Sequence, residues 1–296
     1  MNTALQMRGT LLTNEPLAKY TSWRVGGPAL RMYIPHDKAD LIEFMAGLPE
    51  NEPLVWIGLG SNLLVRDGGI QGTVINTRSR LKEMRLIDSE RVYVEAGVPC
   101  AHVARFCSDL GVVGAEFLAG IPGTMGGALK MNAGAFGGET WGIVDRLEMI
   151  NANGQVIQRG KNEFEVAYRS VKGENSEWFL SVQLQLHKGD SQTSQQHIKA
   201  LLEKRNATQP TNKPTCGSVF KNPPGDYAAR LIEACGLKGY AVGGAVVSQK
   251  HANFIENQGN ATAAEIEILI EHIQRQVLTQ FGIALQTEVC RIGEKA

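Results

Sequence analysis

The segment from residue 111 to residue 142 constrains the fold most, because it is unusually rich in glycine. The whole chain holds 33 glycines in 296 residues, about 11% against an ordinary share of about 7%. There is no collagen-like period and no low-complexity tract, so the glycines must sit in special loops. Glycine adopts backbone conformations that other residues avoid, and it leaves neighbouring N–H groups uncovered.

Two loops carry most of these glycines. The first follows a strand-like run and contains Gly58, Gly60, Ser61, Asn62 and Leu63. The second spans residues 120–138, and its candidate ligand-binding members are Ile121, Pro122, Gly123, Thr124, Gly127, Asn132, Ala133 and Gly134. Neither loop is a P-loop, and Leu63 takes the place of the third glycine of a dinucleotide fingerprint. Residue types alone leave two interpretations open: a dinucleotide or flavin ligand, or tight turns in a sheet-rich fold.

The first third of the chain alternates short strands and helices, and further strands follow the glycine-rich middle segment. Apolar spacing predicts a helix at residues 37–48, and Pro99 and Gly111 delimit a second helix. Asn153-Gly154 predicts a hairpin between strands 144–150 and 155–158. Further strands are expected at residues 54–57, 73–76, 91–96 and 178–186, so the pattern indicates an α+β fold.

The last third begins with a polar stretch, residues 189–196, that we interpret as a domain boundary before a helix at residues 197–206. A helix is expected at 226–235. Thr262 and Glu265 form a capping box for a long helix that Gly282 ends. A strand at residues 283–292 is expected to close the chain.

Charge and cysteine content exclude several classes of protein. Lys plus Arg equals Asp plus Glu at 30 each, so there is no overall attraction to nucleic acid or an anionic membrane. We expect no signal peptide and no membrane span. The five cysteines form no C-x-x-C pair, which favours a reducing cytoplasm, and with six scattered histidines we expect no metal site. Cys100 and Cys107 are expected to share a buried helix face.

Ser218 follows a glycine, as a hydrolase nucleophile does. Phe220 fills the last glycine position of the G-x-S-x-G elbow, so a turn or capping role is the alternative. Tyr168, Arg169 and Glu288, taken singly, are ordinary surface residues.

Taken together and in order, eight segments resemble the UDP-N-acetylenolpyruvoylglucosamine reductases, which are flavoenzymes of peptidoglycan precursor synthesis and are also called UDP-N-acetylmuramate dehydrogenases. They run through nearly the whole chain and comprise residues 21–27, 58–64, 120–138, 168–169, 217–223, 228–236, 248–255 and Glu288.

The resemblance implies an FAD-binding region of the vanillyl-alcohol-oxidase type, made of two α+β subdomains, and a third α+β domain for the substrate. We place these at residues 1–71, 72–196 and 197–288, with residues 289–296 returning to the first. FAD is expected to bind non-covalently through the two glycine loops. The expected partners are NADPH and UDP-N-acetylglucosamine enolpyruvate, using one site in turn.

The resemblance also implies the roles of single residues. Arg169 and Glu288 would stabilise the enol-like intermediate, and Ser218 would protonate it. Tyr168, Lys221, Asn222, Lys250 and Asn253 are weaker candidates for holding the nucleotide sugar or the nicotinamide phosphates.

The chain departs from the family pattern in three places. Val171 stands where a serine is common, and Cys290 stands where many members have arginine, with Arg291 one place later. A one-residue shift in a strand moves a side chain to the other face, so a substrate role for Arg291 is in doubt. Residues 238–249 lack a longer insert, as in the compact branch of the family. The rival interpretations are another flavin oxidase or dehydrogenase of this fold, and a non-catalytic nucleotide-sugar-binding protein.

Overall fold

The structure, a computed structural model, describes residues 8–174 and 176–296. The described chain forms two compact units, between which it passes several times. Unit 1 comprises residues 8–12, 31–59 and 72–204, and unit 2 comprises residues 13–30, 60–71 and 205–296. The division into three domains stays a prediction.

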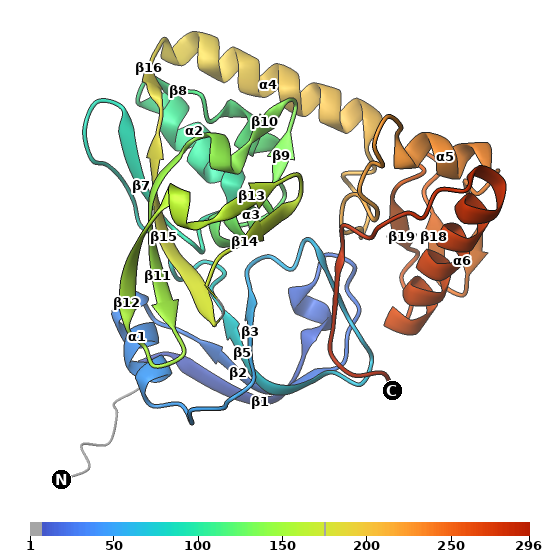
Figure 1. Ribbon diagram of the computed structural model, residues 1–296, viewed down its shortest axis with the longest axis horizontal. Helices are drawn as coiled ribbons and strands as arrows, with labels where there is room; N and C mark the ends of the chain where they lie inside the picture. The colour runs from blue at the N-terminus through green and yellow to red at the C-terminus, as the bar shows by residue number, and fades with distance from the viewer. Residues whose placement is uncertain (1–7, 175) are drawn as a thin grey trace. The chain divides into compact units, whose positions relative to one another are not determined.

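Unit 1 contains an antiparallel sheet of five strands in the order β12-β11-β15-β7-β6, and Figure 1 labels β12, β11, β15 and β7. The predicted hairpin around Gly154 is confirmed, because β11 pairs with β12 and Gly154 has φ +76°. The strands are β6 (Met84–Leu86), β7 (Arg91–Glu95), β11 (Val144–Asn151), β12 (Val156–Gly160) and β15 (Glu177–Gln185).

A second sheet has the order β1-β2-β5-β3. Its strands are β1 (Thr10–Pro16), β2 (Pro28–Ile34), β3 (Leu54–Ile57) and β5 (Ile70–Asn76), and β3 lies parallel to β5. Helix α1 (Lys38–Ala46) is capped by the Asp37 carboxylate, which accepts the Asp40 N–H. The first glycine loop starts where β3 ends.

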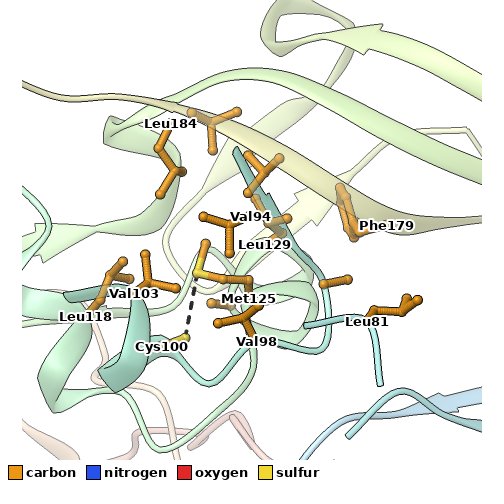
Figure 2. Packing of buried hydrophobic residues seen from close by; sticks show 14 of the residues in the cluster. Leu81, Val94, Val98, Cys100, Val103, Leu118, Met125, Leu129, Phe179 and Leu184 are labelled. Atoms are coloured by element: carbon orange, nitrogen blue, oxygen red, sulfur yellow. Dashed lines mark hydrogen bonds between the residues drawn. The ribbon is translucent and has the colours of Figure 1, made fainter. Parts of the chain in front are cut away.

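Two helices of unit 1 support the second glycine loop. These are α2 (Cys100–Asp109) and α3 (Met125–Met131), which are joined through η2 (Glu116–Gly120). Figure 2 shows Met125 and Leu129 of α3 within the apolar cluster, with Cys100 Sγ 3.9 Å from Met125 Sδ. Cys100 and Cys107 are both buried, as predicted.

The helix predicted at residues 197–206 is longer than expected, because α4 (Ser191–Thr208) already begins within the polar stretch 189–196, and the domain boundary proposed there stays a prediction. Asp190 Oδ2 accepts the Thr193 N–H (2.7 Å), and the Ser194 hydroxyl donates to Glu116 Oε1 (2.6 Å). These polar residues therefore start a helix and do not form a linker. The shorter elements of unit 1 are β8 (Val112–Val113), β9 (Gly134–Ala135), β10 (Gly138–Glu139), η3 (Thr140–Gly142), η4 (Lys161–Glu163), β13 (Glu165–Ala167), β14 (Ser170–Lys172) and β16 (His187–Lys188).

Unit 2 packs α5 (Ala228–Ala234) and α6 (Ala263–Phe281) beside a small sheet of order β17-β18-β19 (Figure 1). The capping box of Thr262 and Glu265 and the left-handed Gly282 at the end of α6 are confirmed. Helix α5 is shorter than predicted. The remaining elements are η1 (Leu17–Tyr20), β4 (Leu63–Val65), β17 (Ala241–Val242), β18 (Ala245–Val247), β19 (Ile255–Asn257) and β20 (Cys290–Ile292).

Strand β20 is the last regular element of the described chain. It pairs in parallel with β4, and Cys290 lies opposite Leu63. The predicted strand at 283–292 is thus regular only in its last part, because Thr287 forms a separate bridge with Phe220. Among the described residues, no helix combines the length and apolar character needed to cross a membrane.

Candidate active site

The two glycine loops meet within unit 1 at Gly58 and Thr124. A Cβ added to Gly58 would lie 2.3 Å from Thr124 Oγ1 and 3.0 Å from its Cγ2. Thr124 is buried and β-branched, so its side chain has little freedom to rotate away. Position 58 must therefore be glycine, because the first loop runs directly against the second.

The second loop presents backbone N–H groups for which the described residues offer no hydrogen-bond partner. Met125 and Gly126, at the start of α3, donate to Val98 O (2.9 Å) and Ala96 O (2.8 Å). By contrast, three other N–H groups of the loop donate no hydrogen bond within the described part of the chain: those of Gly123, Thr124 and Gly127. Unpaired N–H groups in a concave loop bind anions. The loop therefore fits the phosphate-bearing FAD that the resemblance implies.

Other glycines of this loop serve packing within the protein. A Cβ on Gly120 would lie 2.4 Å from the Phe136 ring, and one on Gly138 would lie 2.5 Å from the Phe117 ring. Packing against these aromatic rings therefore accounts for Gly120 and Gly138 without a ligand. The ligand interpretation is favoured at the N–H groups that remain unpaired.

Asn132, a predicted FAD contact, has its side-chain amide occupied by the protein. It is buried and left-handed (φ 45°). Its Nδ2 donates to Glu139 Oε2 (3.0 Å) and Ala167 O (3.3 Å), and its Oδ1 accepts the Trp141 N–H (3.1 Å). The side chain organises the loop, so its predicted contact with FAD stays a prediction that this geometry does not support.

Arg169 is tied to the same loop. Its two terminal nitrogens donate to Asn132 O (3.2 Å) and Gly134 O (3.0 Å), on either side of Ala133. Its guanidinium lies 4.9 Å from the centre of the exposed Tyr168 ring. Arg169 also has φ 52°, a conformation that costs of order 1–3 kcal/mol in a residue other than glycine. The structure thus brings the predicted catalytic arginine to the predicted FAD loop.

The rest of the first glycine loop lies in unit 2. Gly60 has φ +61°, and a Cβ there would lie 2.0 Å from Tyr20 O, so only glycine fits. Asn62 Nδ2 donates to Glu288 O (3.0 Å), and Ser61 beside it is partly exposed. The predicted cofactor loop and the predicted catalytic Glu288 are therefore neighbours.

Ser218 and Glu288 are held on adjacent extended segments of unit 2. Val219 O accepts the Glu288 N–H (2.8 Å), and Lys221 donates its N–H to Gln286 O (2.9 Å). Ser218 and Glu288 are both partly exposed. The structure brings these two predicted catalytic residues together in unit 2, whereas Arg169 belongs to unit 1.

Two of the predicted substrate contacts have structural partners instead. Asn222 Oδ1 accepts the Ala228 N–H (3.1 Å) at the start of α5. Asn253 is only 3% exposed, and its amide bonds both the N–H and the C=O of Phe220. The Asn253 side chain is therefore not placed to meet substrate.

The two candidate lysines lie nearer the surface. Lys221 is partly exposed and Lys250 is exposed, and Lys250 Nζ donates to Asn206 O. Their predicted contacts with diphosphate, like that of Tyr168, stay predictions.

Arg291 belongs to a structural ion pair. Glu267, whose side chain is 8% exposed, binds Arg66 (2.9 Å) and Arg291 (3.2 Å). The hydrogen bond from Arg66 lowers the pKa of the Glu267 carboxyl. This arrangement accounts for Arg291 without a substrate role.

Sequence reasoning gave no role to two buried residues that tie segments of unit 2 together. The buried Cys216 thiol donates to Leu63 O (3.4 Å), and burial raises its pKa to about 12. Trp23 Nε1 donates to Ile255 O (2.7 Å). The matching segment 21–27 contained Trp23, whereas nothing in the sequence pointed to Cys216.

Family models cover much of the chain. An FAD binding domain matches residues 29–160, and the C-terminal domain of UDP-N-acetylenolpyruvoylglucosamine reductase matches residues 209–292.

Relatives match over nearly the full length. The UDP-N-acetylenolpyruvoylglucosamine reductase of Methylococcus capsulatus is 59% identical over 292 residues, covering 99% of this chain and 96% of the relative. That of Legionella pneumophila strain Lens is 59% identical over 98% of this chain and 94% of the relative. The crystal structure of the Thermus caldophilus enzyme superimposes with a TM-score of 0.80 at 30% identity, covering 96% and 99% of the two chains. The predicted α+β fold with an FAD-binding region of the vanillyl-alcohol-oxidase type is confirmed.

Proposed function

Because the chain belongs to the UDP-N-acetylenolpyruvoylglucosamine reductase family, we propose that it reduces UDP-N-acetylglucosamine enolpyruvate to UDP-N-acetylmuramate with NADPH as hydride donor. It is an FAD-dependent oxidoreductase of peptidoglycan precursor synthesis. The observation that carries the proposal is 59% identity across 99% of the chain. The cysteine pattern favours the cytoplasm as its location.

The residues that would hold FAD are the two glycine loops. The N–H groups of Gly123, Thr124 and Gly127 would donate hydrogen bonds to its phosphate oxygens. Gly58 and Gly60, which have no side chain, would let the first loop approach FAD closely. When bound, FAD supplies a carrier that takes hydride from NADPH and passes it to the enolpyruvyl double bond.

Arg169 would stabilise the charge that develops on the substrate. Hydride delivery to the outer carbon leaves negative charge beside a carboxylate, into which it spreads. A cation held at that carboxylate binds the transition state more tightly than the ground state and so lowers the barrier. The carbonyls of Asn132 and Gly134, which accept hydrogen bonds from the guanidinium, help to hold it in place.

Ser218 would supply the proton to the inner carbon. A serine hydroxyl is a weak acid, but a carbanion-like intermediate is a strong base, so transfer at short range is feasible. Glu288 can assist only in its protonated form, because a bare carboxylate would repel the developing anion. Lys221 and Lys250 would pair with diphosphate as compact charges, and Tyr168 would contact the nucleotide.

The replacement Ser218→Ala tests this assignment by anaerobic stopped-flow spectroscopy. NADPH should still reduce the flavin, whereas reoxidation by the enolpyruvyl substrate should slow by about 10²–10⁴-fold, the scale of general acid catalysis. Ser89→Ala, at an exposed position, is the matched control. Equal loss of both half-reactions would refute the role of Ser218.

The same experiment separates the rivals. A different flavin enzyme would not be reoxidised by this substrate, and a non-catalytic binding protein would take up no FAD.

A further inference from the structure

The segment that carries Ser218 is held on one side by the buried amide of Asn253. Asn253 Oδ1 accepts the Phe220 N–H (2.9 Å), and Nδ2 donates to Phe220 O (2.8 Å). Asn253 O also accepts the Val219 N–H (2.9 Å). Asn253 is 3% exposed and Phe220 is 1% exposed, so these bonds are closed to water.

The other side of this segment faces Glu288. Val219 O accepts the Glu288 N–H (2.8 Å), and Phe220 bridges Thr287. The residues after Ser218 therefore lie between Asn253 and the Glu288 segment. Directly before Ser218, a Cβ on Gly217 would meet nothing within 4 Å, and the next anchored side chain is the buried Cys216. The position of Ser218 thus depends on the bonds that follow it as well as on Cys216 two residues before it.

We propose that Asn253 is a positioning residue for proton transfer from Ser218, an inference that rests on the proposed function. A carboxamide both accepts from and donates to the same residue's main chain. An apolar side chain would leave the N–H and C=O of Phe220 unpaired in buried surroundings, which folded proteins avoid. The segment would then shift to find partners and would move the Ser218 hydroxyl with it.

Asn253→Leu tests this inference when the two half-reactions are measured separately under anaerobic conditions. Flavin reduction by NADPH should stay within about twofold of wild type. Reoxidation by the enolpyruvyl substrate should slow by about 10²-fold, the cost of misplacing a reacting group by roughly 1 Å.

Asn257→Leu is the matched control. Asn257 is also a buried amide, but its Nδ2 donates to Trp23 O (2.7 Å) and its Oδ1 accepts the Gly259 N–H (2.7 Å). This variant should lower the melting temperature and leave the ratio of the two half-reactions unchanged.

Asn253→Asp adds a second measurement, the pH dependence of the reoxidation rate relative to wild type, which a merely structural role of Asn253 would not change. A neutral carboxylic acid can donate and accept, as the amide does, whereas a carboxylate can only accept. The rate of the Asp variant relative to wild type should therefore rise as pH falls. The nearby titratable groups are His251, whose Nδ1 accepts the Asn253 N–H (3.3 Å), and Glu288. Both proteins contain these groups, so their effect cancels in the ratio.

Three results would overturn the inference alone: equal slowing of both half-reactions in Asn253→Leu, the same selective loss in Asn257→Leu, or a pH-independent ratio for Asn253→Asp. Failure of the wild-type protein itself to be reduced by NADPH and reoxidised by the substrate would overturn the proposed function, and this inference with it.

Discussion

Replacing Gly58 by alanine probes how tightly the two glycine loops are packed. The new Cβ would lie 2.3 Å from Thr124 Oγ1 and 3.0 Å from Cγ2, well inside contact distance. Thr124 is 3% exposed and precedes α3, so relief requires the loop to move. Overpacking of this kind costs about 1–3 kcal/mol of unfolding free energy. If the displaced loop loses about 1.4 kcal/mol of cofactor binding, the affinity for FAD falls about tenfold.

The assay is a double-mutant cycle with Thr124→Ala, which removes the atoms that clash. Urea unfolding of the flavin-free protein gives stability, and flavin fluorescence titration gives FAD affinity. We expect a favourable coupling of about 1–2 kcal/mol between the two substitutions. Gly142→Ala is the control, because a Cβ there meets nothing within 4 Å. Wild-type stability and affinity in Gly58→Ala, or no coupling, would refute the packing argument.

Three further predictions concern ion pairing and cysteine reactivity. Glu267→Gln should lower the unfolding free energy by about 1–3 kcal/mol near neutral pH. Because Arg66 lowers the folded-state pKa of Glu267, this contribution is present above the unfolded pKa of about 4.3 and is lost as pH falls through the lower folded value. If urea titrations in acid still show the same difference in unfolding free energy between wild type and Glu267→Gln, the prediction is contradicted. Arg291→Gln should lower stability yet change the KM for the enolpyruvyl substrate by less than about twofold, and a large rise in KM would restore a substrate role. Iodoacetamide near pH 8 should alkylate the exposed Cys290 first, whereas Cys100, Cys107 and Cys216, whose pKa burial raises to about 12, should react only after unfolding; early labelling of Cys216 by peptide mass spectrometry would show that its loop opens.

Local signals in the sequence predicted the elements that depend on local interactions. The capping box at Thr262 and Glu265 and the glycine at 282 are contacts within one helix, so they can be recognised without a fold. Asn153-Gly154 likewise carries its own turn geometry. The start of α4 was missed because its first turn has no apolar pattern: the Asp190 carboxylate accepts the Thr193 N–H, and the Ser194 hydroxyl donates to Glu116, far away in the chain.

The candidate site also contains residues that the sequence identified and contacts that only the fold reveals. The ordered segments identified Ser218 and Glu288, and the structure places their segments side by side. The sequence could not tell which glycines face a ligand, because the neighbour of Gly120 is Phe136 and that of Gly58 is Thr124. Asn253 was assigned to substrate because an asparagine in a polar cluster gives no sign that both its polar atoms bond a main chain 33 residues away.

The central claim is tested most directly by following the flavin of the wild-type holoenzyme without oxygen. The account predicts that NADPH bleaches the yellow protein, that the enolpyruvyl nucleotide restores the colour, and that the recovered nucleotide is UDP-N-acetylmuramate. A flavin that NADPH reduces but that stays reduced in the presence of the enolpyruvyl nucleotide would contradict it.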